Sequence, residues 1–259
     1  MSNPSYNFSR LFSELGGLQH LKIRGPQYST ILVECFIEPI SHLTLLESLK
    51  LARISHEDCE AIKNLDTCIS NIQNLKQLVL NEVDVINWSW GQHQGPPNLV
   101  KLTIRDCAQL CLPDLPWLIS NWAPNLTHLE LKPDETLDIL PGVEPPVFDL
   151  ERNLFNLPNL TNLTIWPANE CHYIHSFKYC KTLQHLKFYQ FHNSNLSEEL
   201  SEIFNLITLN EFPKLKSISL PLDLKNYPLG ANVTFILFQL NSFCNSKKIQ
   251  FDYFKCDVP

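Results

Sequence analysis

The segment Asn159-Leu-Thr-Asn-Leu-Thr-Ile-Trp166 places Leu160, Leu163 and Ile165 in the spacing L-x-x-L-x-L. The same spacing of apolar residues recurs along the whole chain. Its copies begin at Leu18, Leu46, Leu75, Leu99, Leu126, Leu160, Leu183 and Leu215. Successive copies therefore begin 23 to 34 residues apart, and chance does not produce eight of them.

Each copy predicts one short β-strand with a buried face. The last two apolar residues of L-x-x-L-x-L alternate with more polar ones, which is the period of a half-buried strand. One copy cannot bury its apolar side alone, so neighbours stack and their strands form a parallel sheet. The period and the core are those of a leucine-rich repeat. We therefore predict an α/β leucine-rich-repeat solenoid of about eight to nine irregular repeats. Its curved parallel sheet is expected on the concave side, with helices and irregular returns on the convex side.

The segments between the strands predict these returns. Residues 55–69 and 197–207 begin with a serine, carry acidic residues in the first turn and repeat apolar residues at helical spacing. Weaker patterns favour helices at 30–43, 113–122, 147–156, 170–180 and 232–244. Residues 132–147 are expected to form a protruding loop, because they are rich in proline and lie in the longest interval. A degenerate ninth strand is expected within residues 246–254, in a C-terminal capping repeat over residues 232–259.

The position three residues after each repeat core is mostly apolar. It holds Pro26, Ile54, Val83, Cys107, Asp134, Ala168, Phe191 and Asp223. Many leucine-rich repeats place asparagine there to satisfy the backbone of the turn. Its absence indicates irregular repeats with long helical returns rather than the regular type found in secreted proteins.

Composition favours one intracellular domain over residues 1–259. The chain is 44% hydrophobic, which supplies an ample core, and it carries a net charge of −7. We find no apolar run long enough to span a membrane and no secretory signal at the start. The nine cysteines are odd in number and irregularly spaced, as expected for reduced thiols. We expect the protein in the cytoplasm or the nucleus.

The sequence predicts no catalytic residue, no metal site and no cofactor. The sharpest metal candidate is Cys171-His172-Tyr-Ile-His175-Ser-Phe-Lys-Tyr-Cys180, which contains two cysteines and two histidines. Its spacing matches no zinc motif, and a helical return with buried cysteine and exposed histidine is the favoured interpretation. Cys107 and Cys111 fit the repeat as core residues. No nucleophile elbow, phosphate-binding glycine loop or zinc-protease motif is present.

The residues that face out of the concave sheet point to binding. They occupy positions 3, 5 and 7 of L-x-x-L-x-L-x, and across eight repeats they include seven Lys or Arg and only one acidic residue. A basic face on an acidic chain can steer an acidic partner. The residues predicted to bind the partner are Lys22, Arg24, Lys50, Lys101, Arg105, Lys132, Trp166, Lys187 and Tyr189.

Position 7 of four successive repeats is the sharpest part of this prediction. It holds Arg105, Lys132, Trp166 and Tyr189 on adjacent strands, and Arg, Trp and Tyr most often carry binding energy at interfaces. The plainer alternative is an ordinary solvated strand surface, with Trp166 under a loop. A further alternative is nucleic-acid binding by the basic strip. The acidic remainder of the chain counts against it.

Two families share features of this chain. The irregular repeats, the helical returns and the stretch Trp122-Ala-Pro-Asn-Leu-Thr-His-Leu-Glu-Leu131 resemble the repeat region of F-box/leucine-rich-repeat proteins, particularly fungal ones. That resemblance implies a substrate-binding repeat region, which an F-box would link to a Skp adaptor and a cullin ubiquitin ligase. The first repeat starts too early here to leave room for an F-box, so ligase recruitment would need one supplied elsewhere. Leu102 to Leu115 also resembles the repeat region of plant nucleotide-binding immune receptors.

Overall fold

The structure is a computed structural model of the whole chain. It describes residues 12, 14–57, 59–84, 94–107, 115–133, 153–166, 173–189, 196–221 and 230–254. The predicted 132–147 loop lies almost entirely outside these ranges. The prediction of one domain over residues 1–259, with a capping repeat at 232–259, includes residues outside them and stays a prediction.

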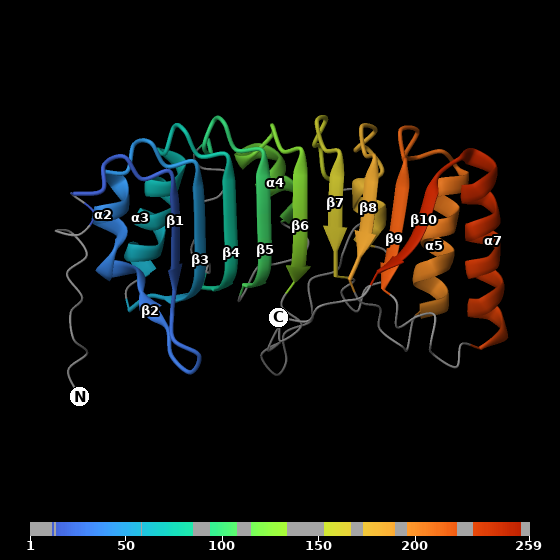
Figure 1. Cartoon of the computed structure of the whole chain (residues 1–259), viewed down its shortest axis with the longest axis horizontal. Coiled ribbons are helices and arrows are strands. Elements are labelled where there is room, and N and C mark those ends of the chain that lie inside the picture. The colour runs from blue at the N-terminus through green and yellow to red at the C-terminus, as the bar shows by residue number, and fades with distance from the viewer. Residues whose placement is uncertain are drawn as a thin grey trace.

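One sheet organises the described residues (Figure 1). Its ten strands pair in parallel, and neighbours in the sheet follow chain order. The strands are β1 (His20–Arg24), β2 (Ile31–Leu32), β3 (Ser48–Ser55), β4 (Gln77–Val83), β5 (Lys101–Cys107), β6 (His128–Pro133), β7 (Asn162–Ile165), β8 (His185–Phe188), β9 (Ser217–Pro221) and β10 (Gln250–Phe254). Only β2 leaves the main path, because it pairs with the end of β3. The fold is an α/β leucine-rich-repeat solenoid, as predicted.

The repeat spacing sets the register. In each pair of neighbouring strands, equivalent positions of the repeat lie side by side. Leu49 lies beside Leu78, and Leu78 lies beside Leu102. All three are at most 1% exposed. The first leucine of the spacing is equally buried in most repeats, as Leu46, Leu75 and Leu160 show. A continuous apolar core therefore runs behind the sheet from one end to the other.

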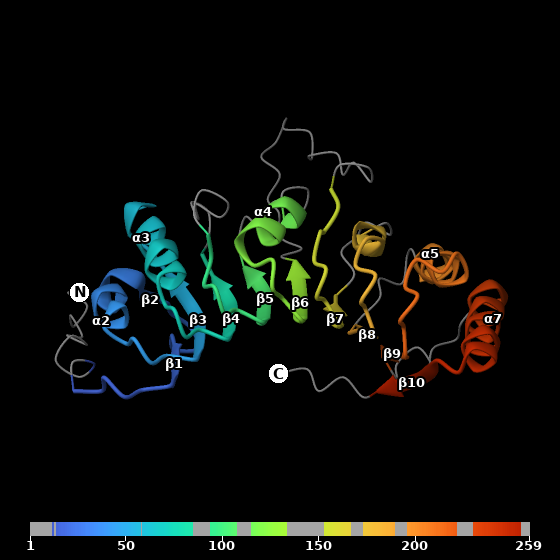
Figure 2. The same cartoon turned by 90° about the horizontal axis from the view of Figure 1, so that it is seen from above.

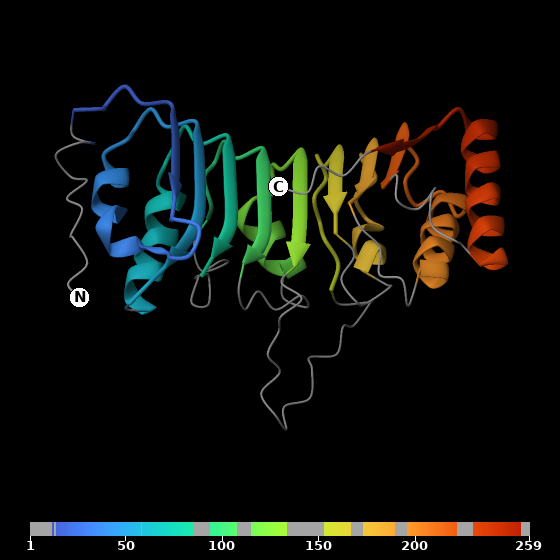
Figure 3. The ribbon, with the colours of Figure 1, turned by 60° about the horizontal axis from the view of Figure 1, so that its bottom comes forward.

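The helical returns cover one side of the sheet (Figure 2). They are η1 (Val33–Cys35), α2 (Ile37–Ser41), α3 (Cys59–Ser70), α4 (Leu115–Trp122), η2 (Tyr173–Phe177), α5 (Leu196–Thr208) and α7 (Ala231–Lys247). The strands follow an arc, with these returns on its outer side. Figure 3 shows α5 and α7 side by side at the C-terminal end, where Phe204 and Phe243 meet edge to face. No helix in the described ranges combines the length and apolarity that a membrane span requires.

Three predicted helices differ from the structure. Residues 30–43 are divided into a two-residue strand, a 3₁₀ turn and a five-residue helix. Residues 170–180 contain the 3₁₀ turn η2, because the interval from Leu160 to Leu183 is the shortest in the chain and leaves little room for an α-helix. Residues 153–156, the described part of 147–156, are not helical. Pro158 follows them closely, and proline disfavours helical backbone in the residue before it.

Strands β3, β4 and β5 continue past the repeat core through a left-handed residue. Arg53, Glu82 and Asp106 have φ of 55°, 53° and 48°. This conformation, uncommon outside glycine, turns the next side chain inward. Those next residues are Ile54, Val83 and Cys107, all at most 1% exposed. The apolar position after the core, where other repeats use asparagine, is therefore an added layer of the core.

Trp122 joins the end of α4 to two other repeats through hydrogen bonds. It is 1% exposed, and its indole Nε1 donates a hydrogen bond to Ser70 Oγ at 3.1 Å. The backbone N–H of Gly95 donates to the Trp122 carbonyl at 3.0 Å. A Cβ on Gly95 would meet that carbonyl and the indole ring well inside contact distance. Only glycine permits this close approach.

Candidate functional site: the concave face

The strand register places the predicted binding residues in three columns across the sheet. The first, middle and third columns hold positions 3, 5 and 7 of the repeat. The middle column contains Lys22, Lys50, Val79, Thr103, Glu130, Thr164 and Lys187 on successive strands. Its neighbours along each strand are apolar residues of the core, nearly all of them buried. Because side chains alternate along a strand, the columns face away from the helices, on the concave side. We call these columns the concave face.

The third column extends one residue past the ends of β7 and β8, where backbone hydrogen bonds continue the strand pairing. The N–H of Trp166 donates to the carbonyl of Leu131 at 3.0 Å, and the N–H of Tyr189 donates to Ile165 at 3.0 Å. Trp166 and Tyr189 therefore continue the column that contains Arg24, Ala52, Asn81, Arg105 and Lys132. The predicted row Arg105, Lys132, Trp166 and Tyr189 is present on adjacent strands.

Four of these side chains form one continuous stack. The Trp166 and Tyr189 rings are parallel within 3°, with centroids 3.9 Å apart. The Arg105 guanidinium lies over the Trp166 ring at 5.1 Å, and Lys187 Nζ lies over the Tyr189 ring at 4.5 Å. We call Arg105, Trp166, Tyr189 and Lys187 the ring stack. All four residues are half-buried. Each ring therefore has a cation over it in addition to the other ring.

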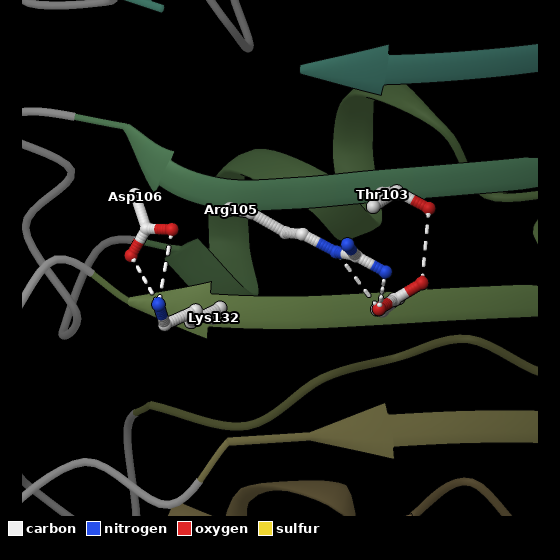
Figure 4. Close-up of polar contacts among 5 residues, drawn as sticks. Thr103, Arg105, Asp106 and Lys132 are labelled. Carbon is white, nitrogen blue, oxygen red and sulfur yellow. Dashed lines mark hydrogen bonds and ion pairs between the residues drawn. The ribbon is translucent and has the colours of Figure 1, made fainter. Parts of the chain in front are cut away.

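Arg105 on β5 and Lys132 on β6 already have acidic partners (Figure 4). Glu130 accepts hydrogen bonds from Arg105 Nε at 3.0 Å and from Thr103 Oγ1 at 3.4 Å. Lys132 Nζ lies 2.8 Å from Asp106 Oδ1. The positive charge of Arg105 and Lys132 at the centre of the concave face is therefore offset within the sheet by Glu130 and Asp106.

The first strands differ in this respect. Lys22, Arg24 and Lys50 are exposed and have no ion-pair partner among the residues that the structure describes. We call these three residues the charged end. Lys101 on β5 is likewise exposed and unpaired within the same ranges, but it lies in the first column. The unpaired positive charge of the concave face is thus concentrated on β1 and β3.

The first column brings histidines near Lys101. His128 lies beside Lys101 in register, and His185 lies two strands further along. Burial, then the charges of Lys101 and His185, lower the pKa of His128. His128 Nδ1 lies 2.8 Å from Thr127 Oγ1, and His185 Nδ1 lies 2.8 Å from Ser217 Oγ. The lowered pKa favours the neutral form of His128.

The cysteine and histidine segment is only partly described. Cys171 and His172 lie outside the described residues. His175 Nδ1 lies 3.1 Å from Glu202 Oε1, and Cys180 is fully buried. Within the described ranges, no group of three or more Cys, His, Asp or Glu side chains is placed to hold a metal ion. Cys107 is buried, whereas Cys111 lies outside those ranges.

Comparison with known proteins adds a distant likeness in structure. The chain matches no protein-family model and no curated protein sequence. Among solved structures it is similar to an internalin (inlF) from Listeria monocytogenes, with 17% sequence identity and a TM-score of 0.42 over 81% of this chain. The match spans 49% of that internalin chain, about half its length. The assignment of the fold rests on the sheet and register of this chain rather than on that likeness.

Sequence reasoning found every member of the ring stack but missed its polar partners. Glu130 belongs to the same columns and could have been paired with Arg105 on the neighbouring strand. Asp106 gave no signal, because it occupies the left-handed position outside the strand alternation. The contact of Arg105 with Trp166, two strands away, depends on how far the long arginine side chain reaches.

Proposed function

We propose that this protein is a non-catalytic module that binds a protein partner on its concave face. The observation that carries the proposal is the ring stack, in which Arg, Trp and Tyr side chains of nearby repeats are already held against one another. These residue types supply most of the binding energy at interfaces, and side chains already held in place lose little entropy on binding. The partner is expected to have an acidic surface, because the charged end is unpaired.

Affinity capture from native cells with reversed charges tests the proposal. One bait is the intact protein, and the second carries Lys22→Glu and Lys50→Glu. A matched control carries Lys214→Glu and Lys247→Glu, which change the net charge equally outside the three columns. We expect a partner retained by the intact and control baits and lost by the second. Equal recovery by all three baits would contradict a concave site.

The finer proposal is that this partner is a ubiquitin-ligase substrate, as the resemblance to F-box/leucine-rich-repeat proteins implies. If an F-box is supplied elsewhere, Skp and cullin subunits should co-purify with the intact bait and with the concave variant alike, because they would dock outside the sheet. A nucleotide-binding immune receptor would instead require a nucleotide-binding module. Recovery of neither assembly would leave a binding module without ligase recruitment.

We further propose that the protein works in the cytoplasm or the nucleus. Cys35, Cys68, Cys107, Cys180 and Cys244 are free thiols, and the last three are buried. Such thiols are typical of a reducing compartment. Imaging of the tagged native protein tests this location, and a luminal or surface signal would contradict it.

Salt dependence separates protein binding from the nucleic-acid alternative. Phosphate binding by the unpaired cations would fall steeply as salt rises. We expect no measurable binding of duplex or single-stranded nucleic acid even at low salt, because the chain carries a net charge of −7. Binding at low salt that disappears with Lys22→Glu and Lys50→Glu would favour the alternative.

A further inference from the structure

The concave face has two chemically different parts, set apart along the sheet. At the charged end, Lys22, Arg24 and Lys50 have no acidic partner within the described ranges. At the ring stack, by contrast, Arg105 is held by Glu130. An acidic group gains most where cations are unpaired, whereas beside Glu130 and Asp106 it would also meet like charge.

The ring stack is suited to an aromatic group. The edge of an aromatic ring is electropositive and its face is electronegative. The Trp166 and Tyr189 rings stack on each other, the Arg105 guanidinium lies over the Trp166 ring, and Lys187 Nζ lies over the Tyr189 ring. These contacts favour approach of a partner to the ring edges rather than to the faces. The group that best complements two parallel positive edges is the negative face of another aromatic ring, laid across them.

The distance between the two parts sets a spacing. From β3, which carries Lys50, the sheet crosses β4, β5 and β6 to reach β7 beside Trp166. Four steps of about 4.8 Å span about 19 Å, and an extended peptide covers that distance in roughly six residues. The outward residues of β4 between them are Gln77, Val79 and Asn81, which carry no charge. Nothing on β4 selects for acid or aromatic chemistry in the intervening peptide.

We propose that the partner segment is bipartite: a cluster of acidic residues that pairs with Lys22, Arg24 and Lys50, and about six residues away an aromatic side chain that lies across the edges of Trp166 and Tyr189. This inference rests on the proposed function, because it assumes a protein partner on the concave face. It adds the chemistry of the partner and the spacing of its two anchors.

A displayed library of random peptides of about 16 residues, long enough to cross both parts, tests the inference. The library is selected on the intact protein, and the enriched peptides are resynthesised. Their affinities are then measured against three variants that retain the circular dichroism spectrum of the intact protein. The first carries Lys22→Glu and Lys50→Glu, the second carries Trp166→Leu, and the control carries Lys214→Glu and Lys247→Glu. Tyr189→Leu is a second ring variant should Trp166→Leu fail to fold.

We expect enriched peptides to contain both anchors at the stated spacing. The charge variant should weaken them at least about tenfold, as should replacement of the acidic residues of the peptide. Against the intact protein, the aromatic peptide should bind about fivefold to tenfold more tightly than the same peptide with alanine in place of the aromatic residue. Trp166→Leu should abolish this difference in affinity and leave the contribution of the acidic residues unchanged. The control should bind like the intact protein.

Different failures have different meanings. Enriched peptides that are acidic, lose affinity with the charge variant and show no aromatic anchor would overturn the bipartite inference while keeping the concave site. Enriched aromatic peptides whose affinity is unchanged by the charge variant would also overturn the bipartite inference while keeping the concave site. Peptides that bind all variants equally, or no enrichment at all, would overturn the proposed function together with the inference.

Discussion

The Arg105 guanidinium lies 5.1 Å from the centroid of the Trp166 ring, although β6 runs between the strands that carry the two residues. Glu130 on β6 makes this contact possible, because it accepts a hydrogen bond from Arg105 Nε at 3.0 Å and holds the side chain across the strand. The ring stack and Glu130 thus come from four successive repeats, the last of which supplies Lys187 and Tyr189. Its geometry depends on the register of the sheet.

Loss of Arg105 should cost measurable stability. Arg105→Ala removes a half-buried cation–π contact and an ion pair, so we expect the free energy of unfolding to fall by about 1–2 kcal/mol. Lys101→Ala removes an exposed, unpaired cation on the same strand and should change it by less than about 0.5 kcal/mol. Urea unfolding followed by circular dichroism compares the two variants. Equal losses would show that the ring stack contributes nothing.

Stability should fall as pH rises, because of Glu199. This residue of α5 is 3% exposed, and neither carboxylate oxygen has a hydrogen-bond partner among the described residues. Burial raises the pKa of Glu199 from 4.5 to about 7. A raised pKa in the folded state means that its contribution is complete below pH 4.5 and is lost as pH rises through about 7.

The shift corresponds to at most about 3 kcal/mol. Glu199→Gln, which keeps the shape without the charge, should therefore raise the melting temperature at pH 8 and change it little at pH 4.5. Thermal unfolding across this range measures the difference between the two proteins. Glu198→Gln, on the same helix, is the matched control. A Glu199→Gln curve parallel to that of the intact protein would contradict the buried charge.

Three thiols should resist alkylation in the folded protein. Cys107, Cys180 and Cys244 are at most 1% exposed, and burial raises the pKa of Cys180 to about 12 and that of Cys244 to about 11. Only the thiolate reacts readily, so access and ionisation both oppose modification. Mass spectrometry after iodoacetamide treatment at neutral pH should find all three unmodified, and all modified in urea. Modification without unfolding would contradict the packing described for these residues.

Gly95 should not tolerate a side chain. In Gly95→Ala the added methyl group meets the Trp122 carbonyl and indole ring, which also anchor α4 through Ser70. We expect a loss of about 1–3 kcal/mol in the free energy of unfolding, the usual cost of overpacking. Gly17→Ala is the matched control, because nothing lies within 4 Å of its added Cβ. Comparable melting temperatures for both variants would contradict the close contact between Gly95 and Trp122.

The columns of the concave face could be predicted from the sequence, because parallel in-register strands convert a spacing along the chain into neighbours across a sheet. The pairing of Arg105 with Glu130 and of Lys132 with Asp106 could not, since it depends on side-chain reach and on the left-handed backbone at Asp106. The returns were harder to predict than the strands. Residues 173–177 form a 3₁₀ turn because the length of the repeat, rather than helix propensity, decides what fits.

The uncharged outward residues of β4 have a consequence for how such a protein could change its target. Each repeat contributes one strand, so removing or duplicating the whole β4 repeat would move the charged end relative to the ring stack by about 4.8 Å. Neither part would lose a side chain. The number of repeats therefore sets the distance between the charged end and the ring stack. Selectivity for a partner could be changed by the number of repeats rather than by their side chains.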